Sequence, residues 1–158
     1  MRFSSLPLVA PITKALKTNG KMAKRFVDTN LFDDDWVVGL SKDGKLFFFY
    51  FITKCDHAGM LKINKKIISF QIGIEDVDSV IMELNGRLIH VSGDLYFMPK
   101  FIDFQYPNFP KSTVMQQHGA INLLKSKNLW DYEKDTYLTT QSKTSEVFKT
   151  LRESLKEI

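Results

Sequence analysis

The chain has little cysteine and no long apolar run. Its 158 residues include one cysteine, Cys55, so an internal disulfide is excluded and the composition fits a reducing compartment. The longest apolar run, from Leu46 to Ile52, is much shorter than the roughly 20 residues that cross a bilayer, and we interpret it as a buried segment. The sequence therefore predicts a cytoplasmic protein without a membrane partner.

Motifs for common enzyme chemistry are also absent. The sequence holds no GxxxxGK[ST] phosphate loop, no GxGxxG and no GxSxG. Cys55–His57 is an adjacent triplet, but His90 and His118 are isolated, so no second pair has the spacing of metal ligands. The consecutive acids Asp33–Asp35 would point in different directions from a helix start, which favours a solvated cap over a magnesium site. We expect no enzymatic activity, no metal and no cofactor.

Acidic residues are missing from the first 25 positions. That segment carries six bases, whereas the other 133 residues hold 16 bases and 18 acids, so the net charge of +4 belongs to an arm rather than to a domain. We predict that residues 1–25 form a disordered basic arm and that residues 1–21 are dispensable for folding. Three interpretations stay open: an organellar transit peptide, a basic tail that touches phosphates, or an extension upstream of a translation start at Met22.

The rest of the sequence has the composition of a domain with a filled core. Thirteen phenylalanines and 44% hydrophobic residues favour such a core over disorder. The pattern predicts a short helical turn at 33–40, which begins in acidic residues. A central buried helix at 41–54 follows, with Ser41 as its cap, and then a short extended segment at 60–63.

Two further helices and a hairpin come next. Asn64 can cap a helix at 65–72, and Gly73 can end it in the left-handed conformation that a tight corner requires. Three apolar residues of this helix are expected to share one face: Ile67, Ile68 and Ile72. The next helix is predicted at 74–86, and its apolar stripe consists of Ile74, Val77, Val80, Ile81 and Leu84. Strands at 88–91 and 95–98 then pair across the turn Ser92–Asp94.

This order of elements predicts the fold class. Helix, short strand, helix, tight turn, helix and hairpin is the order of a winged helix-turn-helix, so we expect an α+β, mainly helical fold with additional C-terminal helices. The winged-helix domain with its C-terminal extension is predicted at 26–129, with a loop or short helix after Lys100 and a helix at 113–127. Residues 130–158 are predicted to form a polar linker, at 131–145, and an amphipathic helix.

Three stretches of the chain resemble a known family. FVDTNLFDDDWVVGLSKDGKLFFFYFITK, GMLKINKKIISFQIGI and VDSVIMELNGRLIHVSGDLYFMPKFIDFQYPN are similar to the N-terminal winged-helix domain of phage-type replication proteins, which include replisome organisers and DnaD-like helicase-loading proteins. The resemblance covers roughly residues 26–129 and consists of hydrophobic patterns. It implies a replication initiation accessory whose partners are double-stranded DNA and, beyond it, a replicative helicase or helicase loader.

The charge pattern limits how such a domain would read DNA. In a helix-turn-helix the second helix of the pair enters the major groove, yet the start of this one carries Glu75, Asp76 and Asp78. Carboxylates are repelled by the phosphates that wall the groove, so direct base readout is disfavoured. Five bases are instead predicted to contact phosphates with little sequence specificity: Lys62, Lys65, Lys66, Arg87 and Lys100.

A second interpretation uses the same features differently. The acidic helix at 74–86 can face a basic protein partner, and the last amphipathic helix can mediate assembly, in which case the chain is a protein-interaction module that does not touch DNA. The lysines would then form a solvated face. Homo-oligomerisation stays open in both interpretations.

Overall fold

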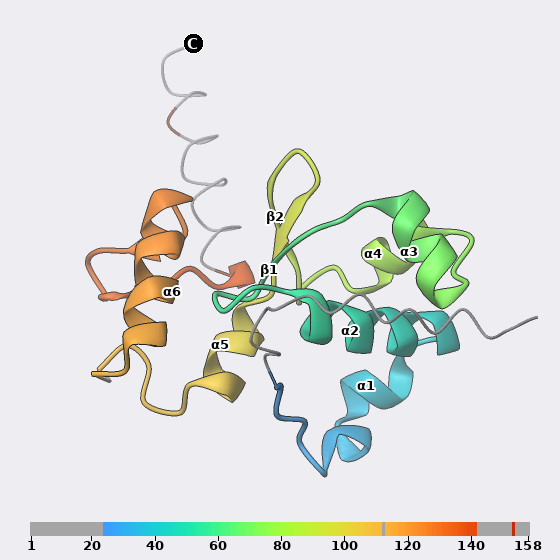
Figure 1. Cartoon of the computed structure of the whole chain (residues 1–158), viewed down its shortest axis with the longest axis horizontal. Coiled ribbons are helices and arrows are strands. Elements are labelled where there is room, and N and C mark those ends of the chain that lie inside the picture. Colours follow the sequence, from blue (N-terminus) through green and yellow to red (C-terminus); the bar gives the residue numbers. More distant parts are fainter. Residues whose placement is uncertain (1–23, 112, 142–152, 154–158) are drawn as a thin grey trace, which may run out of the picture.

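The computed structural model describes residues 24–111, 113–141 and 153, and within them the fold is α+β (Figure 1). In chain order the elements are η1 (Leu31–Asp33), α1 (Asp35–Gly39), α2 (Lys42–Lys54), β1 (Met60–Lys62), α3 (Lys65–Ile72), α4 (Val77–Glu83), β2 (Ile89–Ser92), β3 (Leu95–Phe97), α5 (Pro99–Gln105), α6 (Met115–Ser126), β4 (Trp130–Asp131) and β5 (Thr136–Tyr137). Among the helices in these ranges, none has both the length and the apolar character needed to traverse a bilayer.

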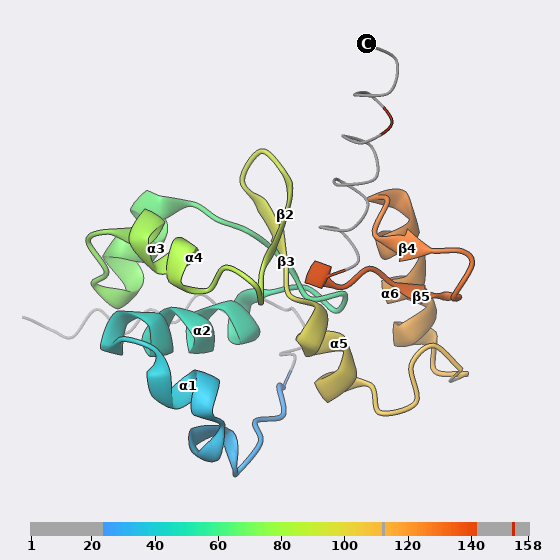
Figure 2. The same cartoon turned by 180° about the vertical axis from the view of Figure 1, so that it is seen from behind.

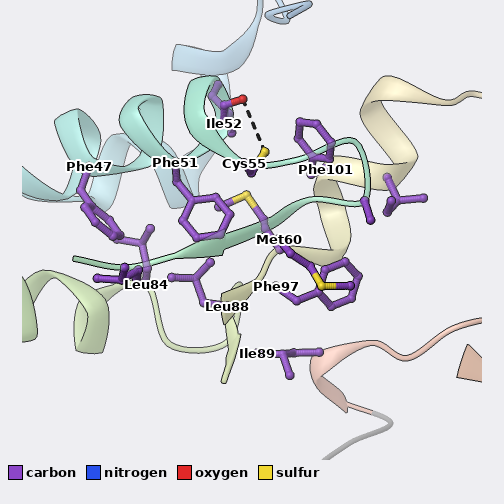
Figure 3. Packing of buried hydrophobic residues seen from close by; sticks show 14 of the residues in the cluster. Phe47, Phe51, Ile52, Cys55, Met60, Leu84, Leu88, Ile89, Phe97 and Phe101 are labelled. Carbon is purple, nitrogen blue, oxygen red and sulfur yellow. Dashed lines mark hydrogen bonds between the residues drawn. The ribbon is translucent and has the colours of Figure 1, made fainter. Parts of the chain in front are cut away.

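Helix α2 is the centre of the fold, as the sequence predicted. Helices α3 and α4 lie on one side of it, and α1 lies on the other (Figure 1). Phe47 and Phe51 are fully buried. Figure 3 shows them pointing from α2 toward the side chains that precede and form the sheet, among them Leu84 and Met60. The burial of these rings supplies much of the apolar area that holds the helices and the sheet together.

The start of α2 is fixed by a local cap and by a distant carboxylate. The Ser41 hydroxyl accepts a hydrogen bond from the Gly44 amide at 2.9 Å, as its sequence position predicts. The same hydroxyl donates to Glu83 at the end of α4 over 2.7 Å, and the Ser41 amide donates to the other carboxylate oxygen over 2.5 Å. A Cβ on Gly44 would lie 2.6 Å from a Glu83 oxygen, so glycine leaves room for the Glu83 carboxylate against the start of α2.

Helix α4 is shorter than the predicted helix at 74–86. Asp76 accepts a hydrogen bond from the Ser79 amide at 3.0 Å and is the cap, so α4 begins at Val77. A short acidic side chain competes for the backbone amides of the first turn, and this local bond outweighs the apolar stripe that started at Ile74. Ile74 is still buried, in the turn after α3. Gly73 has φ of 71°, so the predicted left-handed end of α3 is confirmed.

Strands β1, β3 and β2 form an antiparallel sheet in that spatial order. Phe97 of β3 lies opposite Met60 of β1 and opposite Ile89 of β2. The β2–β3 hairpin projects from the body of the molecule (Figure 2). Its turn contains Gly93 at φ of 52°, within the predicted turn at Ser92–Asp94. The sequence thus predicted the hairpin and its turn to within one residue.

The chain after the sheet differs more from the expectation. Helix α6 matches the helix predicted at 113–127, and α5 fills the segment predicted as a loop or short helix. The segment predicted as a polar linker instead contains the β4–β5 hairpin, and Trp130 and Tyr137 of this hairpin belong to the hydrophobic core. Asp131 turns the chain by accepting hydrogen bonds from the amides of Glu133 and Lys134. Two apolar residues seven positions apart are too sparse a signal for the periodicity that the prediction used.

Several predictions concern residues beyond the described ranges. The basic arm as far as residue 23, the translation start at Met22 and the terminal amphipathic helix lie there, apart from Glu153. Arg25, the last residue assigned to the arm, is described and contacts the domain. The Arg25 guanidinium donates to the Cys55 carbonyl at 2.6 Å and lies 5.2 Å from the ring centroid of Phe101.

Candidate functional site

The structure separates the five predicted phosphate contacts into two groups. Lys62 lies opposite Leu95 in the sheet, beside the turn of the β2–β3 hairpin, and the helix start at Lys65 follows directly. Lys100 and Arg87 adjoin the other end of the sheet, because Lys100 follows Phe97 and Arg87 precedes Ile89, the residue paired with Phe97. We call the first group, Lys62, Lys65 and Lys66, the basic edge.

Within the basic edge, one lysine is already paired. Lys65 Nζ lies 2.6 Å from Asp78 Oδ1, and both side chains are more than half exposed. The hydrogen bond from this ammonium to Asp78 raises the pKa of Lys65. Lys62 and Lys66 are exposed, and no described residue forms an ion pair with them. The edge therefore presents two unpaired cations and a third whose charge is partly offset by α4.

The surface beside the basic edge is acidic. Glu75, Asp76 and Asp78 are exposed at the start of α4, where the sequence placed them, and Asp94 is exposed in the hairpin turn. The hairpin from residue 88 to residue 98 contains no lysine or arginine. Within β1, α3, α4 and this hairpin, the three lysines are thus the only lysine or arginine residues.

Three large apolar side chains are exposed next to these charges. Phe70 on α3 is 91% exposed, Ile67 on α3 is 48% exposed and Met82 on α4 is 75% exposed. Ile67 was expected to share a buried apolar face with Ile68, and this expectation is wrong, since Ile68 is buried and Ile67 is not. Adjacent residues of a helix are about 100° apart, so only one of the two can face α2 fully.

The second group of cations lines a cavity of about 400 Å³ between residues 26–37, α2 and α5. We call it the aromatic cavity, because five aromatic side chains line it: Phe26, Trp36, Phe48, Phe101 and Phe104. The Arg87 guanidinium lies 4.7 Å from the centroid of the Trp36 ring. Lys100 is 3.9 Å from a carboxylate oxygen of Asp103. Both bases predicted to touch phosphate are therefore part of a concave, largely apolar site.

One wall of the aromatic cavity is the segment before α1, which the sequence analysis did not connect with a site. The Gln105 side-chain amide donates to the Phe26 carbonyl at 3.2 Å, and the rings of Phe32 and Phe49 lie 6.0 Å apart. With the contact of Arg25 to Phe101, these interactions attach the segment to α2 and α5. The aromatic residues at positions 26, 32 and 36 are the signal by which the sequence could have indicated a packed segment here.

Cys55, whose carbonyl accepts the hydrogen bond from Arg25, is buried and chemically quiet. Its side chain is 2% exposed, and burial raises the pKa of the thiol from its ordinary 9.0 to about 12. A thiol that stays protonated at neutral pH is a poor nucleophile and a poor metal ligand. In the part of the chain that the structure describes, no three histidines, cysteines or acids gather in a way that could hold a metal ion.

Comparison of the chain with models of protein families, with curated proteins and with solved structures found no match.

Proposed function

We propose that residues 42–97 form a winged helix-turn-helix and that the chain is a DNA-binding accessory of phage-type replication initiation. The chain order α2, β1, α3, α4, β2, β3, the spatial order β1-β3-β2 and the left-handed Gly73 between α3 and α4 support the fold assignment. The resemblance to phage-type replication proteins supports the role in replication. The protein would then act in the cytoplasm, without enzymatic activity, near a replicative helicase or helicase loader.

The observation that carries the proposal is the basic edge. Lys62, Lys65 and Lys66 are exposed together at the end of β1 and the start of α3, on the helix that precedes the tight turn. The first helix of a helix-turn-helix pair crosses the DNA backbone, so cations at its start are placed to meet phosphates. Duplex DNA is the proposed ligand.

The acids define how this binding would behave. Glu75, just before the cap of α4, and Asp78, in its first turn, lie at the end of the helix that would approach the major groove, so bases would not be read there and affinity would be weak and tolerant of sequence. Since Lys65 is paired with Asp78, we assign most of the attraction to Lys62 and Lys66.

The test is a titration of fluorescent duplex DNA with the full chain at several salt concentrations, read by anisotropy. Changing Lys62 and Lys66 to Ala should weaken binding to all sequences alike and reduce the log–log salt slope by about two, because each phosphate contact releases roughly one counterion. The control variant changes Lys111 and Lys127, which are exposed elsewhere, to Ala, so it has the same net charge as the variant of Lys62 and Lys66. Equal loss in both variants would contradict the assignment to the basic edge.

A second candidate function rests on the exposed apolar side chains. Ile67 and Phe70 lie on α3, and Met82 lies on α4, the helix whose start carries the acids. This combination fits a basic amphipathic protein segment, which would bury the apolar groups and neutralise the carboxylates. If the chain showed no DNA binding even at low salt and bound a basic amphipathic helical peptide in a way that Phe70→Ser abolished, the protein-interaction function would replace the DNA-binding one.

A further inference from the structure

The aromatic cavity has the properties of a small-ligand site. Its volume of about 400 Å³ lies within the range of roughly 300–1,000 Å³ that such sites occupy. Its walls come from the segment before α1, from α2 and from α5, and the segment is fastened by Gln105 and Arg25. The proposed DNA contacts on the basic edge leave this cavity unexplained.

The charged side chains that line the cavity differ in whether they already have hydrogen-bonding partners. Each lining carboxylate already accepts a hydrogen bond: Asp28 from the Asn30 amide at 2.9 Å, Asp34 from the Trp36 amide at 2.8 Å, and Asp103 from the Tyr137 hydroxyl. Burial, together with that hydrogen bond, raises the pKa of Tyr137, so its proton stays in place. These three acids therefore already form hydrogen bonds that stabilise the fold.

Arg87 has a different environment. The Cζ atom of its guanidinium lies over the Trp36 ring, 4.7 Å from the centroid, and no described residue forms a hydrogen bond or an ion pair with the guanidinium. The contact with the ring uses none of its N–H groups as donors to an oxygen, and their fork geometry matches the oxygens of a phosphate or carboxylate. Lys100, at 3.9 Å from Asp103, is the second cation on the lining. The unassigned binding capacity of the cavity is thus for an anion.

The aromatic lining residues indicate which chemical group the ligand carries besides its anion. Phe26 and Phe104 are partly exposed at 75% and 41%, and Trp36 and Phe48 form an edge-to-face pair with ring centroids 5.5 Å apart. Aromatic side chains at the mouth of a cavity favour a planar ring, which gains stacking energy on their faces. A fatty acyl chain would use the apolar walls but would not need several ring faces.

We propose that the aromatic cavity binds a mononucleotide unit, with the base among the aromatic rings and the phosphate on Arg87 and Lys100. The unit can be a free nucleotide or one nucleotide of a single strand, since both present the same base and phosphate. This site is separate from the basic edge and from the proposed binding of duplex DNA. The three lining carboxylates would repel a long run of phosphates, so we expect the free nucleotide to bind at least as well as a strand.

The experiment uses the fluorescence of Trp36 in the full chain. The chain has two tryptophans, and Trp130 lies away from the cavity, where it is buried beside Lys125. Stepwise addition of dTMP should quench Trp36 and reach saturation, while thymidine, which lacks the phosphate, should bind roughly 10- to 100-fold more weakly. The oligonucleotide (dT)12 separates the two sources, because a lower half-saturation concentration than that of dTMP assigns the site to a strand.

Variants test the roles of the individual groups. Arg87→Gln should weaken dTMP binding roughly 10-fold or more, and Lys100→Gln should weaken it by a smaller factor. The matched control Lys127→Gln, on an exposed lysine remote from the cavity, should leave dTMP binding unchanged. If Arg87→Gln lowered the thermal stability, Lys100→Gln alone would decide, since Lys100 is exposed and lies outside the core.

Two results would overturn the proposal. One is the absence of saturable quenching by dTMP and by (dT)12 at millimolar concentration. The other is equal binding of dTMP to the wild type, to Arg87→Gln and to Lys100→Gln. Neither result depends on Lys62 or Lys66, so the proposed duplex binding and the nucleotide site can fail independently.

Discussion

On the basic edge Lys65 is held by a carboxylate, whereas at the aromatic cavity Arg87 is held by an indole ring. The carboxylate partly cancels the charge of the lysine in an exposed place where solvent screens the pair. The ring leaves the charge of the arginine intact and keeps its hydrogen-bonding groups free. Under the two proposals, cationic side chains would therefore meet different ligands: exposed phosphates along the basic edge, and a single anionic group in the aromatic cavity.

The largest expected effect concerns the core that both regions share. Phe51→Ala should lower the free energy of unfolding by about 3–5 kcal/mol, because Phe51 is fully buried between α2 and the sheet. Urea denaturation followed by circular dichroism measures it. Phe70→Ala is the control, since its ring is 91% exposed, and it should change the free energy of unfolding very little. A large loss in the control would mean that the α3–α4 surface is covered in solution.

A smaller effect is expected at the turn that positions the basic edge against α4. Gly73→Ala should cost about 1–2 kcal/mol, because Gly73 has φ of 71°, where a Cβ is strained. Gly39→Ala is the matched substitution: a Cβ there meets nothing within 4 Å, and Gly39 belongs to a helix. The melting temperature should fall in Gly73→Ala and should stay the same or rise slightly in Gly39→Ala. Equal melting temperatures would contradict the strained turn.

The buried Cys55 thiol should make the stability of the folded chain depend on pH in alkaline solution. The folded chain holds the Cys55 proton up to a pKa of about 12, against an ordinary 9.0, so between these pH values the folded state binds more protons than the unfolded state. Stability should therefore be unaffected below pH 9 and decline as the pH rises toward 12. Cys55→Ala should make this decline shallower in denaturation curves. Rapid reaction of the native thiol with a disulfide reagent at pH 8 would contradict its burial.

The smallest effect on stability is expected on the basic edge. Asp78→Asn removes an exposed ion pair, so the melting temperature should hardly change. The same substitution frees Lys65 and removes a carboxylate that would face phosphate, so duplex DNA should bind more tightly in the anisotropy titration. Asp135→Asn, an equal change of charge in the β4–β5 turn, is the control. If both variants gained equally, the gain would come from net charge alone and not from the edge.

Local signals predicted the elements around these regions well. Ser41 and Asn64 cap the helices that they were expected to cap, and Gly73 ends α3 in the expected conformation. The hairpin turn contains Gly93, as its sequence predicts. Each of these features is decided by a hydrogen bond or a backbone preference within a few residues, which is why single-sequence reasoning finds it.

Other features depend on residues far apart in the chain. Glu83 reaches Ser41 across 42 positions, Gln105 contacts Phe26 across 79, and Trp130 and Tyr137 join a core whose other members precede them. The residues adjacent to them in the sequence carry no pattern that predicts these distant partners.

The amino-acid sequence by itself determined the order of helices and strands from α1 to β3, the α2 core and the positions of the five basic residues, because periodicity, caps and charge are local properties. Only the tertiary structure decided which of those bases stand together. It placed Lys62, Lys65 and Lys66 on an open edge and Arg87 and Lys100 on an aromatic cavity, since the antiparallel pairing of β3 with β1 and β2 sends the two groups to opposite ends of the sheet.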